Sequence, residues 1–249
     1  MLLINPQYEE QRPYLAQIAK HFEQEGEIIY GGRNLIKTLT MPNGETVNVK
    51  RYHKPAFINK LVYSLRIRQP KGMRAFLYPN VLLKKGIATA QPIAYIEERN
   101  ALGLLQFSYF VSQQVPFATL LYHIEDLPDE MGKKLAQDLA KFTAHMHDEE
   151  VLHKDFSPGN ILCHEQNGSF EFCLVDINRM YFGAVNMQQG ADNLKRLWGS
   201  KSFITEVARN YARLRHFDEE TFINLTLEQR KRFWKRYTKK HGAPFEIDY

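Results

Sequence analysis

Three polar side chains near the middle of the chain are spaced as phosphoryl-transfer chemistry requires. Asp155 belongs to a His-x-Asp pattern, Asn160 follows it by five residues, and Asp176 ends an apolar run sixteen residues later. Phosphoryl transfer needs a carboxylate that accepts the proton of the acceptor hydroxyl, and oxygen ligands that hold Mg²⁺ against nucleotide phosphates. We therefore interpret Asp155 as the catalytic base, and Asn160 and Asp176 as the metal ligands.

The three residues together are a more specific signal than any one of them, because His-x-Asp alone occurs by chance in many chains. Here the Asn is followed by a turn and by an apolar strand that ends in Asp, which is the arrangement of a protein-kinase-like site. The competing interpretation is a buried polar loop whose Asp and Asn side chains cap turns. We expect His153 to support the loop by hydrogen bonding rather than to react.

A β-hairpin is expected to position the metal ligands. Residues 161–163 and 170–175 form two apolar runs, and Asn167-Gly168 between them is a turn signal. Such a hairpin brings Asp176 beside Asn160. Cys163 and Cys173 lie on its two arms and could face each other, although small core residues are the better interpretation of both.

The amino-terminal half offers a place for the nucleotide phosphates. Strands are expected at residues 27–30, 35–40 and 46–50, with Gly31 and Gly32 in the first turn and Lys50 ending the third strand. Glycines let backbone N–H groups approach phosphate oxygens closely, and Lys50 would reach the α- and β-phosphates. The full G-x-G-x-x-G pattern is absent, so an ordinary hairpin with a solvated lysine is the alternative.

The segment from residue 46 to residue 96 contains no Asp or Glu but ten Lys and Arg residues. This composition suggests a positive face for phosphate-rich or membrane-surface ligands; ordinary solvated helix residues are the alternative. Kinases usually pair the strand lysine with a Glu on the following helix, and Leu77 lies where that Glu would fall. Either another acid substitutes through space, or Lys50 is held differently.

Helices are expected at residues 8–25, 131–147 and 203–214, and from a capping box at Thr226 and Gln229 to about Gly242. The last helix carries seven basic residues between Arg230 and Lys240, interleaved with aromatic residues. Core-packing aromatic residues with a solvated basic face explain this pattern, and a membrane-surface contact is the functional alternative.

Composition bounds the class of protein. A chain of 249 residues suits one two-lobed domain or two small ones. It has no apolar run long enough to span a membrane and no recognisable secretory signal. The net charge of +5 permits an anionic partner without identifying one, and we expect no nucleic-acid partner.

We predict an α+β, two-lobed protein-kinase-like fold, with an antiparallel sheet in an N-lobe over residues 1–112 and a mainly helical C-lobe over residues 113–249. The chain between Asp176 and Asp192 is too short for the activation segment with which a regulated protein kinase binds a peptide. This shortness favours a non-protein acceptor.

The chain resembles the bacterial lipopolysaccharide kinases, the group that includes Kdo kinases and core heptose kinases. The resemblance spans roughly residues 27–200, and its matching segments are 30–34, 47–51, 86–87 with 92–94, 153–162 and 174–179. It implies ATP and Mg²⁺ as cofactors, and phosphorylation of a sugar in the inner core of lipopolysaccharide. It also implies a cytoplasmic location, peripheral at the inner face of the cell membrane.

Carried over by position, the resemblance makes Asp155 the base, Asn160 and Asp176 the metal ligands, and Lys50 an ATP-binding residue. Two alternatives remain at this point. One is a kinase of another small molecule or of protein side chains. The other is a pseudokinase that binds partners or nucleotide without transferring phosphate, for which the missing helix Glu is the best support.

Overall fold

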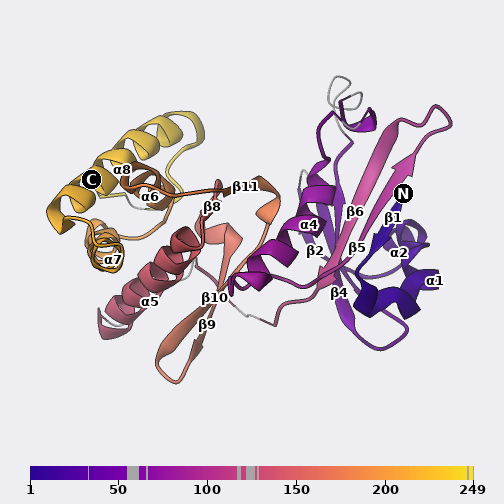
Figure 1. Ribbon diagram of the computed structural model, residues 1–249, viewed down its shortest axis with the longest axis horizontal. Coiled ribbons are helices and arrows are strands. Elements are labelled where there is room, and N and C mark those ends of the chain that lie inside the picture. Colours follow the sequence, from indigo (N-terminus) through magenta and orange to yellow (C-terminus); the bar gives the residue numbers. More distant parts are fainter. Residues whose placement is uncertain are drawn as a thin grey trace. The chain divides into compact units, whose positions relative to one another are not determined.

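The chain forms two compact units in a computed structural model that describes residues 1–32, 34–54, 62–65, 67–116, 119–121, 127, 129–245 and 247–248 (Figure 1). Unit 1 comprises residues 1–84 and 89–116, and unit 2 comprises residues 85–88 and 117–249. The expected division into functional lobes at residues 112 and 113 remains a prediction.

Unit 1 is built on a six-stranded antiparallel sheet with the order β1-β5-β6-β4-β3-β2. Its strands are β1 (Leu2–Ile4), β2 (Glu27–Gly31), β3 (Leu35–Thr40), β4 (Thr46–Tyr52), β5 (Pro92–Arg99) and β6 (Leu105–Gln113). The turn between β3 and β4 forms at Gly44, whose φ of 84° lies in the left-handed region. Glycine adopts that conformation without the steric cost of a side chain.

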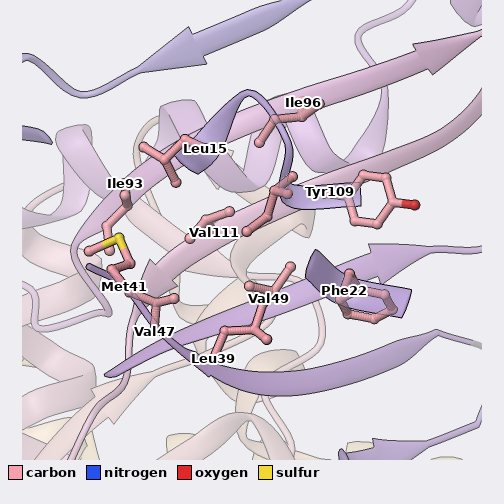
Figure 2. Close-up of a cluster of buried hydrophobic side chains, with 12 residues drawn as sticks. Leu15, Phe22, Leu39, Met41, Val47, Val49, Ile93, Ile96, Tyr109 and Val111 are labelled. Carbon is pink, nitrogen blue, oxygen red and sulfur yellow. The ribbon is translucent and has the colours of Figure 1, made fainter. Parts of the chain in front are cut away.

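One face of this sheet is covered by the amino-terminal helices α1 (Arg12–Leu15) and α2 (Ile18–Gln24). Figure 2 shows Leu15 and Phe22 from these helices against Val49, Tyr109 and Val111 of the sheet. Leu15 and Phe22 are fully buried, so the two helices supply part of the hydrophobic core of unit 1.

The expected single helix over residues 8–25 is wrong. A 3₁₀ helix, η1 (Pro6–Gln11), comes first, and α1 and α2 are separate. Pro13 has no N–H and is tolerated only in the first turn of a helix, so a new helix must begin around it. Gln17 then leaves helical geometry, with φ of −104° and ψ of 14°.

The opposite face of the sheet carries α4 (Lys71–Lys84). A Cβ atom on Gly72 would lie 2.7 Å from a ring carbon of Tyr95 on β5 and 3.2 Å from a ring carbon of Tyr52 on β4. The missing side chain at residue 72 therefore lets α4 pack directly on this face, which is also the face of Lys50, two residues before Tyr52.

In the described residues, unit 2 combines short strands with four longer helices. Its strands form two small antiparallel sheets: β10 (Ser169–Leu174), β9 (Ile161–Gln166) and β7 (Thr119–Leu120), then β11 (Met180–Phe182) and β8 (Val151–His153). Its helices are α5 (Asp129–Asp148), α6 (Met187–Leu194), α7 (Lys201–Leu214) and α8 (Glu219–His241), with 3₁₀ turns η3 (Pro158–Asn160) and η4 (Ile177–Arg179). Helix α7 packs against both α5 and α8.

The last helix begins earlier than predicted. The side chain of Asp218 accepts a hydrogen bond from the Thr221 N–H at 2.9 Å and so caps α8. Thr226, expected to be the cap, is fully buried within the helix. The capping box of this unit is instead formed by Asn186 and Gln189 at the start of α6.

Arg230 does not belong to the exposed basic face expected on α8. Its side chain is 2% exposed and donates to the carbonyls of Leu197 and Gly199 at 2.5 and 2.6 Å. Arg230 therefore satisfies buried backbone acceptors inside unit 2, whereas Arg232, Lys235 and Lys239 are exposed.

The two cysteines are free and buried in the β9–β10 hairpin. Cys163 lies opposite Phe172, and Cys173 lies opposite Leu162. Because successive strand residues alternate between faces, this register puts Cys163 and Cys173 on opposite faces. Both cysteines are core residues, which confirms the preferred interpretation. The alternative, that they face each other, is wrong.

Candidate active site

His153 holds the central loop of unit 2 together. Its buried ring accepts a hydrogen bond from the Asp155 N–H at Nδ1, at 3.0 Å, and donates from Nε2 to the carbonyl of Val175, at 3.1 Å. This pattern requires a neutral ring with its proton on Nε2. Burial lowers the pKa of His153, which favours the neutral form. These bonds agree with the predicted supporting role of His153.

Asn160 joins Asp155 to the segment that follows β10 and carries Asp176. Its side-chain N–H donates to the backbone carbonyl of Asp155 at 2.8 Å, and its own carbonyl accepts from the Val175 N–H at 3.0 Å. Val175 immediately precedes Asp176. The three residues that sequence spacing selected therefore lie on one hydrogen-bonded framework within unit 2.

Asp176 is exposed and adopts the left-handed conformation, with φ of 51° and ψ of 40°. Asp and Asn tolerate this region better than most residues do. The side chain of Asn178, which is 4% exposed, donates a hydrogen bond to the Asp176 carboxylate. This backbone turn aims Asp176 out of β10, and sequence reasoning missed both the turn and the contribution of Asn178.

Two arginines hold the carboxylate of Asp155. Its Oδ1 accepts from Arg196 at 2.6 Å, and its Oδ2 accepts from Arg179 at 3.3 Å. The Asp155 side chain remains 27% exposed, so solvent or a ligand can still reach it. Arg196 follows α6 and is forty-one residues from Asp155 in the chain, so no local pattern could have revealed this contact.

The donor set fits Mg²⁺. This ion prefers oxygen ligands and is usually bound by one or two protein groups together with substrate phosphates. The side-chain nitrogen of Asn160 donates to the Asp155 carbonyl, so the Asn160 Oδ1 is the amide atom that could act as a ligand together with the Asp176 carboxylate. Throughout the described part of the chain, no three His, Cys, Asp or Glu side chains form a metal-binding group. A site completed by nucleotide phosphates is the kind that these two oxygen donors could form.

The other predicted site residues lie in unit 1. Gly31 ends β2, Gly32 follows it, and Lys50 lies on β4. Ile36 on β3 pairs with both Tyr30 and Lys50, so the register aligns the end of β2 with Lys50 across one intervening strand. At a strand spacing of about 4.8 Å, that separation is roughly 10 Å. The Lys50 ammonium lies 5.4 Å from the centre of the Tyr52 ring.

Helix α4 contains no acidic residue, as the sequence indicated. Glu97 on β5 is a buried acid on the Lys50 face of the sheet, because it pairs with Ser108, which also pairs with Tyr52. Its carboxylate accepts hydrogen bonds from Tyr95 at 2.8 Å and from Arg99 at 2.7 Å. The lysine–glutamate pair usual in kinases therefore has no counterpart from α4.

A chain of buried polar side chains also supports the His153 loop. His147 on α5 contacts the Tyr211 hydroxyl at 2.7 Å and the Asn193 Oδ1 at 3.1 Å, and Asn193 donates to the His153 carbonyl at 2.8 Å. Burial lowers the pKa of His147 to about 4. The folded protein therefore binds a proton at this site less readily than the unfolded chain does.

Stability is expected to fall as the pH drops from about 6.5 towards 4. Over this window the unfolded chain carries a proton on His147 and the folded protein does not, so acid favours unfolding. Between pH 7.5 and 5.5 His147 should remove on the order of 1 kcal/mol of unfolding free energy, and burial of His153 acts in the same direction. Urea unfolding at the two pH values measures this loss.

Two single variants make this measurement specific. His147→Gln cannot titrate, so its stability should fall less between pH 7.5 and 5.5 than that of the wild type. His145→Gln changes an exposed histidine on the same helix and should keep the full loss. An equal loss in His147→Gln and the wild type would show that another group controls the acid response.

The class of protein follows from these features together. An antiparallel-sheet unit with a strand lysine, and a helical unit with the His-x-Asp-x4-Asn loop and a strand ending in Asp, define a protein-kinase-like fold. The solved structure titled "WaaP in complex with acyl carrier protein" superposes with a TM-score of 0.60 at 16% identity, covering 94% of this chain and 99% of that one. This likeness confirms the predicted fold.

The family follows from the sequence match. Residues 22–217 match the model of the lipopolysaccharide kinase (Kdo/WaaP) family, and the chain therefore belongs to that family. It is also 27% identical over 159 residues to a 3-deoxy-D-manno-octulosonic acid kinase of Mannheimia succiniciproducens, with 61% of this chain aligned. The alignment spans 62% of that relative's length.

Proposed function

We propose that this protein is an ATP-dependent kinase that phosphorylates a hydroxyl of a sugar in the inner core of lipopolysaccharide. The observation that carries the proposal is the framework that joins Asp155, Asn160 and Asp176 within a few hydrogen bonds. Family membership supports the same reaction class. The named substrate of the Mannheimia relative, an octulosonic acid, makes Kdo the first acceptor to test, with heptose as the second.

In the proposed reaction, Asp155 accepts the proton of the acceptor hydroxyl as its oxygen attacks the γ-phosphorus of ATP. The bond from that phosphorus to the bridging oxygen breaks, ADP leaves, and the sugar becomes a phosphate monoester. Arg179 and Arg196 fix the orientation of the Asp155 carboxylate. When bound, Mg²⁺ offsets the negative charge of the phosphates, and Asn160 and Asp176 would hold it.

The nucleotide phosphates are assigned to residues of unit 1. Lys50 would contact the α- and β-phosphates, and the backbone at Gly31 and Gly32 would approach the phosphate oxygens. At Gly32 a Cβ atom would lie 2.7 Å from the Tyr30 hydroxyl, so a larger residue there would displace that ring. The glycine keeps the backbone of this turn accessible.

Incubation with radiolabelled ATP and separate acceptors tests the proposed function. Lipid A carrying Kdo, lipid A with a heptose-containing core, a panel of small alcohols, and a protein mixture are offered in parallel. Label should appear in one of the first two acceptors and depend on Mg²⁺. Label in the small alcohols or proteins would reassign the acceptor. ATP binding without transfer to any acceptor would instead favour a pseudokinase, the alternative that acid-free α4 supports.

We further propose that the protein works on the cytoplasmic side, bound peripherally to the inner face of the cell membrane. No helix in the described ranges is both long and apolar enough to cross a bilayer. Exposed cations on α8, including Arg232, Lys235 and Lys239, offer electrostatic attraction to anionic lipids instead. Each cation near such a surface contributes about 1 kcal/mol.

Charge reversal of Arg232, Lys235 and Lys239 to Glu should weaken co-sedimentation with anionic vesicles and leave ATP binding unchanged. The wild type should sediment with these vesicles at low salt and much less at high salt, because exposed contacts are screened. A control variant in which the exposed Lys133, Lys141 and Lys201 are changed to Glu has the same net charge as the α8 variant. Equal loss in both triple variants, or sedimentation with neutral vesicles, would reject a specific role for α8.

A further inference from the structure

Unit 2 contains a cavity of about 590 Å³ beside the proposed catalytic loop. Residues of β8, β11 and α6, with the segments that follow β8 and α6, line it, among them Lys154, Tyr181, Gln188, Asp192, Lys195 and Arg196. Pockets of roughly 300–1,000 Å³ are typical of small-molecule sites. The cavity is therefore large enough to accept a sugar residue.

The charge of this cavity is positive. Lys154, Lys195 and Arg196 contribute cations, whereas Asp192 is the lining carboxylate and forms an ion pair with Lys195. The Lys154 ammonium is exposed and lies 5.6 Å from the centre of the Tyr181 ring. Among the residues that the structure describes, no carboxylate lies within 4.0 Å of this ammonium. Lys154 thus provides a cation for an anionic ligand.

The cavity is connected to the proposed base through shared residues. Arg196 lines the cavity and donates to Asp155 Oδ1 at 2.6 Å. Lys154 immediately precedes Asp155 in the chain, so its side chain and the catalytic carboxylate leave adjacent backbone positions. The cavity therefore adjoins the Asp155 carboxylate through Arg196.

Two of the side chains that line the cavity are held by other contacts. Asn193 lines it, but its amide is engaged by His147 and by the His153 carbonyl. Gln189 has its side-chain oxygen in the capping box of α6, where it accepts from the Asn186 N–H at 3.0 Å. The rigid groups therefore shape the site, while Lys154 and the carboxamide of Gln188 are the groups suited to bind a polar ligand.

We propose that this cavity is the acceptor subsite and that it selects a sugar carrying an anionic group, a carboxylate or a phosphate, which Lys154 binds while a hydroxyl of the same sugar reaches Asp155. This inference rests on the proposed function and adds the acceptor's charge as the determinant of specificity. A neutral sugar would lack the partner for Lys154 and should bind more weakly.

Direct binding of free sugars, measured by ligand-observed NMR without nucleotide, tests the subsite independently of phosphate transfer. The probes are 3-deoxy-D-manno-octulosonic acid, its methyl ester, a neutral heptose and the corresponding heptose phosphate. The wild type should bind at least one anionic probe about tenfold more tightly than its neutral counterpart, which corresponds to about 1.4 kcal/mol. Comparison of the octulosonic acid with the heptose phosphate shows whether the site prefers a carboxylate or a phosphate.

Three variants locate the contact. Lys154→Met should weaken the preferred anionic probe about tenfold and leave the neutral sugars unchanged, and Lys154→Arg should retain most of the affinity. Lys141→Met, at an exposed lysine on α5, should bind as the wild type does. Equal affinity for anionic and neutral probes, no binding of any probe, or unchanged binding in Lys154→Met would each overturn the subsite. A separate assay of phosphate transfer by the wild type tests the proposed function, so the two proposals can fail independently.

Discussion

Asp155→Asn is expected to lower kcat for phosphate transfer at least about a hundredfold, the scale on which a general base contributes. Asn has the same shape as Asp but cannot accept the hydroxyl proton. The loss should appear in kcat, with the KM for ATP little changed, because Asp155 is assigned to the acceptor rather than to the nucleotide. Steady-state kinetics with the acceptor identified by radiolabelling would measure it.

Asp129→Asn is a suitable control for this prediction, since Asp129 is an exposed acid in the first turn of α5. It should retain wild-type turnover. The melting temperature of Asp155→Asn should also be measured, because Arg179 and Arg196 lose a charged partner in that variant. Turnover within a few-fold of the wild type in a folded Asp155→Asn protein would remove Asp155 from the role of base.

The second large effect is expected at Asp176. ATP should raise the melting temperature of the wild type by several degrees only when Mg²⁺ is present, because a ligand that binds only the folded state stabilises it. Asp176→Asn should abolish that shift. Asn is the informative substitution because it tolerates the left-handed backbone at residue 176, so loss of the metal ligand is separated from backbone strain.

The melting temperature of Asp176→Asn without nucleotide provides the internal control and should stay near that of the wild type. Asp129→Asn should keep the full Mg²⁺-dependent shift. If Asp176→Asn also keeps it, the metal and the nucleotide are held by other residues. If ATP stabilises the wild type equally in the presence of EDTA, nucleotide binding does not require the assigned metal ligands.

Local signals in the sequence predicted the elements around the site well. Apolar runs and the Asn167-Gly168 turn place β9 and β10 correctly, and Val175 does bond to Asn160 as the expected hairpin requires. The predicted ends of the helices were less accurate. Thr226 and Gln229 form a plausible capping box in sequence, but Asp218 caps the helix eight residues earlier. A capping pattern acts as a cap only where the backbone is not already helical, and at Thr226 it is already helical.

The sequence also did not predict which basic residues of α8 are buried. Arg230 looks like its basic neighbours, yet it is enclosed and bonded to the Leu197 and Gly199 carbonyls. Which face of a long helix is covered depends on the neighbouring elements, here α6 and α7. A run in which basic and aromatic residues are mixed does not specify that face.

The sequence by itself determined the identity and order of the candidate chemical groups, since Asp155, Asn160 and Asp176 are separated by short segments whose conformation is set locally. It also determined that α4 would carry no acid. Tertiary structure alone decided that Arg196 reaches the Asp155 carboxylate, that Asn193 connects His147 to the loop, and that Lys154 enters a cavity beside α6. These contacts join residues tens of positions apart, and side-chain distances of that kind are fixed only when the helices pack.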